Sequence, residues 1–324
     1  MKRTAGVFLA GAFVACLAAQ VPVFDARNGP LPTARTHFQM PFYRTLSEWE
    51  ARAVNLRKQI LSSVGLFPLP ERTPLHPKVF HRIMREGYST EKVLIETLPG
   101  FYLGGNLYRP LDKSGRLPGI ASPHGHTEYG RLENTQLFSI PARCINLARQ
   151  GYIVFSYDMV GYDDTVQVEH EWGGPHGLGS LREELWSLNT MGLQLWDSIR
   201  AIDFLQSLPD VDPERIAVTG ACGGATQTFL VSAVDPRVKV AAPVNMISAI
   251  LQGGTCQSAP GLREGTFNVE IGALMAPRPL LMVSATGDWT RNTPSEEFPA
   301  IQSIYRLYKK AGLVESFQVD APHN

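Results

Sequence analysis

The sequence of 324 residues predicts an α/β fold, in which a mostly parallel sheet has helices on both faces and a helical extension precedes it. Short continuous apolar runs alternate with amphipathic runs of helical length from about residue 117 to residue 319. Strands that are apolar on both sides are typical of a parallel sheet covered by helices on both faces. A hydrophobic content of 44% and a charged content of 19% are those of a globular protein with a large core.

Residues 1–19 have the composition of an export signal peptide. Lys2 and Arg3 form a positive end, a short apolar segment follows, and small residues precede the expected mature start at Gln20. The apolar segment is too short to span a bilayer, so no transmembrane segment is expected in the mature chain. We therefore expect an exported protein, periplasmic or extracellular. A lipoprotein anchored to the membrane through Cys16 is the alternative.

Residues 20–90 are expected to form an irregular arm and a helical extension that covers the main domain, residues 91–324. The extension helix is expected to begin at Ser47, where Glu50 would complete a capping box. Its apolar face recurs at helical spacing through Trp49, Ala53, Leu56, Ile60 and Val64.

Strands and helices are then expected to alternate along the main domain. Apolar and β-branched runs predict strands at 93–98, 103–108, 117–122, 153–157, 216–219, 238–244, 280–285 and 314–319. Amphipathic runs predict helices at 135–150, 185–208, 224–234 and 298–311. In the second of these helices, Leu188 is expected to face inward.

The stretch Gly220-Ala221-Cys222-Gly223-Gly224 is the strongest chemical signal in the chain. It joins a predicted strand to a predicted helix through a tight turn, which is the setting of a nucleophile elbow. Small neighbours are needed because the central residue is strained and its side chain must stand clear of the backbone. Cys222 is therefore predicted to be a nucleophile, in preference to a buried structural thiol.

Asp288 and His323 are the predicted partners of Cys222. A nucleophile of this kind needs a base, and the base needs an orienting acid. Both residues come just after late strands, in the chain order nucleophile, acid, histidine, so the sheet would bring all three to one edge. His323 is the one histidine that follows Cys222.

The turn Pro123-His124-Gly125-His126 follows another predicted strand. In folds that contain a nucleophile elbow, the loop at this position supplies a second oxyanion donor. The backbone N–H groups of His126 and Gly223 are therefore predicted to form the oxyanion hole. His124 and His126 could instead suggest a metal pair, but no partner set of carboxylates or thiols is evident beside them. No metal and no organic cofactor is expected.

His124, Trp172, His176 and Trp289 are candidates for the substrate pocket, because they lie in loops that often vary around an active site. His170 and Trp186 are further candidates for lining a pocket. Simple packing is the alternative for these aromatic side chains. The role of the loop Gly253-Gly254-Thr255-Cys256 stays open.

The cysteine and charge contents bear on three further possibilities: a disulfide framework, a zinc site and a nucleic-acid partner. Without the signal peptide, Cys144, Cys222 and Cys256 remain, which is no disulfide framework, and no CxxC pair points to zinc. A single Cys144–Cys256 disulfide stays open. The chain has 30 basic and 30 acidic residues without a dense basic run, which argues against a nucleic-acid partner.

Several motifs together resemble the acetyl xylan esterase-like and dienelactone hydrolase-like families of the α/β-hydrolase superfamily, over roughly residues 90–324. They are Pro123-His124-Gly125-His126, Tyr157-Asp158-Met159-Val160-Gly161-Tyr162, Gly220-x-x-Gly223-Gly224, Thr286-Gly287-Asp288-Trp289 and Ala321-Pro322-His323-Asn324. The resemblance implies a Cys222–His323–Asp288 triad with an oxyanion position at His126. Dienelactone hydrolases have a cysteine in the elbow, whereas the esterase-like members generally have a serine.

The resemblance implies a carboxylic-ester hydrolase that forms a thioester with short acyl or carbohydrate esters, and so a small-molecule or carbohydrate ester as its partner. A dienelactone-type lactone hydrolase and a catalytically impaired ligand-binding relic are the alternatives. The family normally continues past the histidine loop into a covering helix. The chain stops at Asn324, so we expect a truncated domain with bare apolar side chains around Phe317 and Val319.

Overall fold

The computed structural model describes residues 32–136, 138–171 and 176–323. The expected signal peptide and Trp172 lie outside these residues. From Ala34 onward the chain forms one compact unit. A helix with the length and apolar character to cross a membrane is not found within the described ranges.

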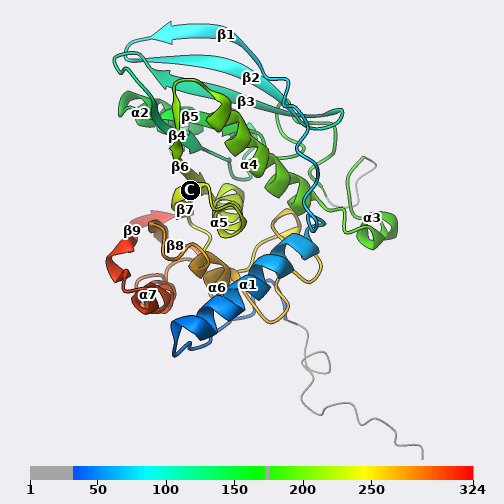
Figure 1. Ribbon diagram of the computed structural model, residues 1–324, viewed down its shortest axis with the longest axis vertical. Coiled ribbons are helices and arrows are strands. Elements are labelled where there is room, and N and C mark those ends of the chain that lie inside the picture. The colour runs from blue at the N-terminus through cyan, green and yellow to red at the C-terminus, as the bar shows by residue number, and fades with distance from the viewer. Residues whose placement is uncertain (1–31, 137, 172–175, 324) are drawn as a thin grey trace, which may run out of the picture. The chain divides into compact units, whose positions relative to one another are not determined.

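A nine-stranded sheet runs through this unit in the order β1-β2-β3-β5-β4-β6-β7-β8-β9 (Figure 1). Its strands are β1 (Lys78–Arg85), β2 (Tyr88–Leu98), β3 (Phe101–Pro110), β4 (Leu117–Ala121), β5 (Ile153–Tyr157), β6 (Val211–Ala221), β7 (Val238–Val244), β8 (Leu280–Gly287) and β9 (Val314–Pro322). Neighbours from β1 to β5 are antiparallel, and all pairs from β5 to β9 are parallel. The predicted α/β fold with a mostly parallel sheet is confirmed.

Helices cover both faces of the sheet. They are α1 (Leu46–Ser63), α2 (Ile140–Arg149), α3 (Leu181–Leu185), α4 (Thr190–Ser207), α5 (Gly223–Val234), α6 (Asn268–Ala273) and α7 (Glu297–Leu307), with short 3-10 turns at Gly130–Leu132, Thr255–Gln257 and Ala311–Leu313. On one face α2 forms a small core with Tyr108, Ile120 and Val154. On the other face α1, α4, α5 and α7 enclose the main core.

Several predicted boundaries are wrong, each for a local reason. The capping box of α1 is Thr45 with Glu48, two residues before the expected Ser47 and Glu50. The strand β1 was not predicted because all of its residues are exposed, so it has no apolar periodicity. It pairs with β2, so the sheet begins before the expected domain boundary at residue 90.

The helix expected over 185–208 is two helices, α3 and α4. Asn189 caps α4 by accepting a hydrogen bond from the backbone N–H of Gly192 at 2.8 Å. This cap interrupts the helical pattern, and Leu188, expected to face inward, is 52% exposed. The helix expected from residue 135 begins at Ile140, because Ser139 is its N-cap and Pro141 occupies the first turn.

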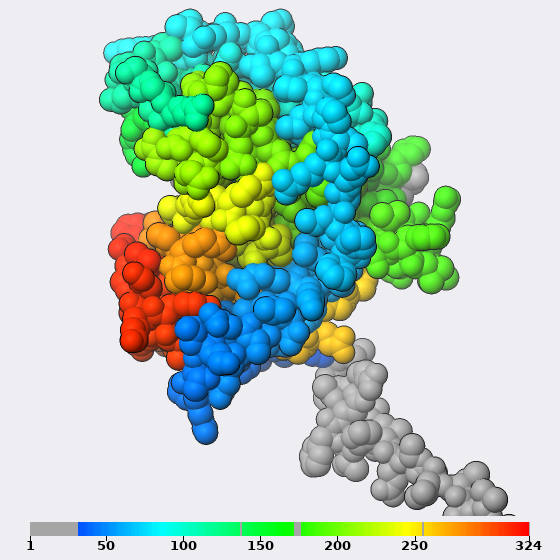
Figure 2. All heavy atoms as spheres, viewed as in Figure 1, coloured from blue at the N-terminus to red at the C-terminus, as the bar shows by residue number. Residues whose placement is uncertain are grey.

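The extension helix α1 is bound to the main core on the side of α5 and α6. Its buried residues are Trp49, Ala53, Leu56 and Ile60, the face expected from the sequence. Arg57 donates hydrogen bonds to the carbonyl oxygens of Ala233 and Leu274 at 2.9 and 3.0 Å. Figure 2 shows the blue side chains of α1 lying against yellow and orange side chains of these later elements.

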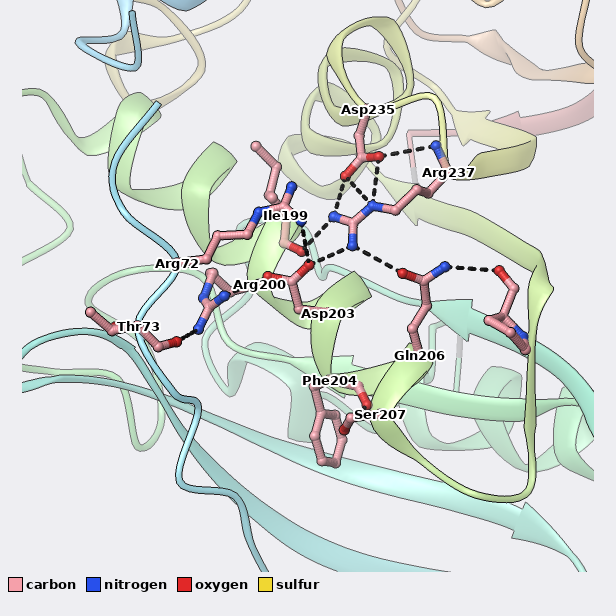
Figure 3. A network of polar contacts seen from close by, with 11 residues as sticks. Arg72, Thr73, Ile199, Arg200, Asp203, Phe204, Gln206, Ser207, Asp235 and Arg237 are labelled. Atoms are coloured by element: carbon pink, nitrogen blue, oxygen red, sulfur yellow. Dashed lines mark hydrogen bonds and ion pairs between the residues drawn. The ribbon is translucent and has the colours of Figure 1, made fainter. Parts of the chain in front are cut away.

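A polar network ties α4 to the turn between α5 and β7 (Figure 3). Arg237 donates to Asp235 at 2.6 Å and also to Asp203 of α4. Arg200, itself buried, pairs with Asp203 and donates to the carbonyl oxygen of Thr73. Pairing of these charges avoids the large cost of an isolated buried ion and joins α4 to the turn that precedes β7.

On the face that α2 covers elsewhere, the β9 end of the sheet exposes apolar side chains. Val240 shares this face with Ala217, its register partner, which packs against the α2 core. Val240, Phe317 and Val319 are 43%, 60% and 41% exposed. The expected exposure of Phe317 and Val319 is therefore confirmed, and these three residues are called the apolar strip below.

Candidate active site

Cys222 occupies a strained turn between β6 and α5. Its backbone angles are φ 54° and ψ −118°, which L-residues rarely adopt. The turn is held on both sides: the Cys222 N–H donates to the carbonyl of Val244 at 3.1 Å, and its carbonyl accepts from the N–H groups of Ala225 and Thr226. A residue kept in such a conformation is typical of a functional site.

The glycines around Cys222 are required by close approach of the β4 loop. A Cβ atom at Gly220 would lie 2.5 Å from the carbonyl oxygen of Pro123, and one at Gly224 would lie 2.4 Å from the same oxygen. Neither contact is sterically allowed. The Gly-x-Cys-Gly-Gly pattern therefore lets the turn carrying Cys222 pack against the turn that carries His126.

Asp288 and His323 meet beside Cys222 at the edge formed by β8 and β9. His323 Nδ1 lies 2.8 Å from Oδ2 of Asp288. The other carboxylate oxygen of Asp288 accepts from the N–H and the hydroxyl of Thr290, each at 2.6 Å. The indole ring of Trp289 lies against the imidazole of His323, with ring centroids 4.0 Å apart and the ring planes tilted by 40°. Because Nδ1 of His323 contacts Asp288, Nε2 is the imidazole nitrogen that can exchange a proton with the thiol of Cys222.

The electrostatics of the three groups favour charge separation. Burial raises the pKa of the Cys222 thiol, but interactions with His126 and His323 outweigh it and lower that pKa to about 6. Burial lowers the pKa of His323, but its interactions with Asp288 and Cys222 raise it to about 9. The pKa of Asp288 is lowered because bonds from His323 and Thr290 outweigh its burial. The shifts of Cys222 and His323 both favour a thiolate beside an imidazolium.

The side chain of His126 lies at the site together with its backbone. Its Nδ1 is 3.8 Å from Sγ of Cys222, and its Nε2 is 2.7 Å from Sγ of Cys256. Burial lowers the pKa of His126, but its bonds to the two thiols raise it to about 10. The sequence assigned only the backbone of His126 to the site, because the pairing with Cys256 joins residues far apart in the chain.

A cavity open to solvent surrounds these groups. It is lined by His126, His170, Cys222, Cys256, Gln257 and Trp289, among others. His170 was a pocket candidate in the sequence and does line the cavity, whereas the role of the loop of Cys256 was left open. Burial raises the pKa of Cys256, but interactions with His126 and His170 lower it to about 7. The glycine-rich loop that carries Cys256 was the available signal, since no histidine lies near it in the sequence.

Two pocket candidates lie away from this cavity. His124 is completely buried: its Nε2 accepts from the N–H of Met159 at 2.9 Å, and burial lowers its pKa to about 3. It is a neutral structural histidine and cannot reach a substrate. His176 is exposed, and its backbone carbonyl accepts from the N–H of Glu169. Trp289 does line the cavity.

The disulfide left open by the sequence is not formed. Cys144, Cys222 and Cys256 are all free thiols. Cys144 lies on α2, in the small core on the opposite face of the sheet. Cys256 lies in the cavity, so the sheet separates the two sulfur atoms.

Comparison with known proteins gives a match over the centre of the chain. Residues 136–246 match the model of the dienelactone hydrolase family. This segment includes the turn of Cys222 and ends before Asp288. YtaP from Bacillus subtilis is 26% identical over 287 residues, which cover 81% of this chain and 90% of YtaP.

Solved structures extend the likeness over most of the chain. Methylesterase BT1017 is 31% identical with a TM-score of 0.75, and the match covers 87% of this chain and 62% of that chain. This chain thus spans less than two thirds of the BT1017 chain. An acetyl xylan esterase from Paenibacillus sp. R4 shares the fold at 20% identity, with a TM-score of 0.52 over 90% of this chain and 92% of its own. The chain therefore has the fold of the α/β-hydrolases, its centre matches the dienelactone hydrolase family, and its structural neighbours include a methylesterase and an acetyl xylan esterase.

Proposed function

We propose that this protein is a carboxylic-ester hydrolase in which Cys222 is the nucleophile, His323 the acid and base, and Asp288 the orienting group. The observation that carries the proposal is the 2.8 Å bond between Asp288 and His323 beside a cysteine in a strained strand-to-helix turn. Short acyl esters or esters of carbohydrates are the proposed substrates. The names of the methylesterase and acetyl xylan esterase relatives support this class.

In the first half of the reaction the Cys222 thiolate attacks the ester carbonyl. A bond forms between Sγ and the carbonyl carbon, and the bond to the alkoxy oxygen then breaks. The imidazolium of His323 gives its proton to the leaving alcohol. The product is a thioester, and Asp288 keeps the His323 ring in the tautomer and orientation that this transfer requires.

In the second half a water molecule releases the acid. His323, now neutral, takes a proton from the water as the oxygen attacks the thioester carbonyl. The carbon–sulfur bond breaks, and the Cys222 thiolate and the His323 imidazolium are restored.

The backbone N–H groups of His126 and Gly223 are proposed to stabilise the oxyanion. Gly223 is the first residue of α5, where helix N–H groups have no intrahelical acceptor. In the described part of the chain, neither N–H donates to another backbone group. Each donor would stabilise the transition state by roughly 3 kcal/mol.

Residues 1–19 are proposed to direct export.

The proposal is tested by hydrolysis of p-nitrophenyl acetate and butyrate, acetylated xylan, a methyl-esterified sugar acid and a dienelactone. Cys222→Ala is expected to lose roughly 10⁴-fold or more in kcat, as removal of a nucleophile does in related triads. Cys144→Ala is the matched control, because that thiol lies in the other core. Full activity of Cys222→Ala on every ester would refute the proposal.

Asp288→Asn is expected to fold normally and to lose about 10⁴-fold in kcat, because the wrong imidazole tautomer is then favoured. Asp320→Asn is the control: this nearby exposed carboxylate binds Thr286 Oγ1 and not His323. Equal rates for the two variants would show that Asp288 does not orient the base.

A lactone hydrolase is the alternative function, because the family match is to dienelactone hydrolases. The activity of Cys222→Ser distinguishes it from the ester hydrolase. A serine-type ester pocket should retain turnover in Cys222→Ser, whereas a pocket built for thiolate chemistry should lose it. Wild-type turnover of the dienelactone with an inactive Cys222→Ser would favour the lactone reading. Ligand binding without turnover of any substrate would favour the relic.

A further inference from the structure

A second cluster of potential ligands lies in the same cavity, and the proposed ester chemistry uses no side chain of this cluster as nucleophile, base or orienting acid. It consists of His126, His170 and Cys256, which come from the loops after β4, after β5 and after β7. One ligand atom from each lies within 4.8 Å of the other two. His126 Nε2 and Cys256 Sγ are 2.7 Å apart, and the two imidazole rings have centroids 5.0 Å apart.

The hydrogen bonding of His170 prepares its free nitrogen for a metal. Its Nδ1 lies 2.7 Å from the carbonyl oxygen of Val160, which can only accept, so Nδ1 carries the proton. Nε2 therefore presents a lone pair, and this atom is buried without a hydrogen-bond partner among the described residues. A metal-binding histidine typically donates its other ring N–H to such a carbonyl, which fixes the tautomer.

Neighbouring residues hold the other two side chains in place. Tyr162 packs edge-on against both His126 and His170, with ring centroids 6.5 and 4.8 Å apart. The backbone carbonyl of Cys256 accepts from the side-chain amide of Gln194 of α4 at 3.0 Å. The cluster is thus supported by a helix of the main core as well as by loops.

Two imidazoles and one thiol are a ligand set that suits zinc. Zinc binds imidazole nitrogen at about 2.0–2.1 Å and thiolate sulfur at about 2.3 Å, so tetrahedral ligand atoms lie about 3.5 Å apart. The observed cluster reaches that spacing if His126 and Cys256 separate slightly and His170 approaches. Three protein ligands leave a fourth position, as in zinc sites that bind water or substrate.

We propose that His126, His170 and Cys256 bind one zinc ion, with its fourth coordination position facing the cavity that Cys222 lines. This differs from the sequence-based expectation of no metal, which considered His124 and His126 alone. The site does not depend on Cys222 acting as a nucleophile, because Cys222 is not one of the three ligands.

The test uses the full chain, freed of metal with a chelator and titrated with Zn²⁺ against a chromogenic chelator. One zinc ion per chain is expected. Co²⁺ in place of zinc should give a thiolate-to-cobalt charge-transfer band and the visible spectrum of a four-coordinate site. Cys256→Ser should abolish the band, and both Cys256→Ser and His170→Ala should weaken zinc binding by at least about 100-fold, since even outer partners are worth 10–100-fold.

Cys144→Ala and Cys222→Ala are the matched thiol controls, and His81→Ala on exposed β1 controls for surface imidazoles. All three should keep the band and the affinity, with circular dichroism verifying the fold of each variant. An unchanged band in Cys256→Ser, a band lost in Cys222→Ala, or no zinc bound at stoichiometric concentration would overturn the proposal. These measurements do not use ester turnover, so they are independent of the proposed enzymatic function.

Discussion

Asp197 shows how one buried side chain sets the pH dependence of stability. It lies fully buried on α4. Burial raises its pKa to about 7, Thr97 opposes this rise, and Asp158 reinforces it. On strand β5, burial raises the pKa of Tyr157, and the negative charge of an ionised Asp197 would raise it further. The neutral acid is therefore the form that the folded state prefers.

Because the pKa of Asp197 is higher in the folded than in the unfolded chain, its contribution to stability is present at low pH and is lost as pH rises from about 4 through about 7. Asp197→Asn should remove this loss. Between about pH 5 and pH 8, the free energy of unfolding should therefore fall less in the variant than in the wild type, by about 2 kcal/mol. Urea unfolding at both pH values measures it.

Asp112→Asn, at an exposed carboxylate, is the control for that experiment and should follow the wild type. If Asp197→Asn kept the full pH dependence of the wild type, the carboxyl group of Asp197 would not be the one that titrates.

At the scale of an element, the start of α1 depends on one hydroxyl. Thr45 Oγ1 accepts from the N–H of Glu48 at 3.2 Å, and the Glu48 side chain returns to the N–H of Thr45. Thr45→Ala should cost about 1 kcal/mol of stability. Ser47→Ala should be nearly neutral, although the sequence pattern alone indicated Ser47 as the cap. A larger loss for Ser47→Ala would contradict this assignment in thermal or chemical unfolding.

The turn between β6 and α5 gives a second prediction at this scale. Gly224→Ala would place a Cβ atom 2.4 Å from the carbonyl oxygen of Pro123. The two loops must then separate, which should cost about 1–3 kcal/mol and reduce ester turnover by displacing Cys222 from its partners. Unfolding curves and kcat measure both effects.

Gly254→Ala is the matched control, because a Cβ atom there has no neighbour within 4 Å although the loop borders the same cavity. If both variants kept wild-type stability and turnover, close packing of the two loops would not be needed for the site.

At the scale of the whole molecule, the apolar strip of Val240, Phe317 and Val319 exposes apolar side chains on one face of the sheet. Exposed apolar surface of this kind favours self-association. Phe317→Gln should slow aggregation and reduce binding of a hydrophobic dye, with little change in Tm, because the side chain is already 60% exposed. Light scattering and dye fluorescence measure these effects.

Phe42→Gln is the comparison for this test. Phe42 is 80% exposed but lies before α1, away from the strip. Equal effects of the two substitutions would show that total exposed apolar area matters, and not its concentration on one sheet face.

The alternation of strands and helices and the place of the Cys222 turn could be predicted from local sequence patterns. Local signals were sufficient there: continuous apolar strands, glycines on both sides of Cys222, and a helical apolar face from Trp49 to Ile60. The meeting of Asp288 with His323 was also predictable, since both follow parallel strands that end at the same edge of the sheet. Each of these inferences needed only chain order and the direction of the strands.

Packing of the whole chain brings together side chains from distant loops, which local patterns do not predict. The contact of His126 with Cys256 spans 130 residues, and the buried ring of His124 accepts a hydrogen bond from the N–H of Met159, 35 residues away. The pairing of β1 with β2 depends on backbone hydrogen bonds, which cannot be predicted from the pattern of side chains in β1. Loop conformation and side-chain direction arise from packing of the whole chain, so a histidine in a motif cannot be assigned to the core or to the cavity from its neighbours in sequence.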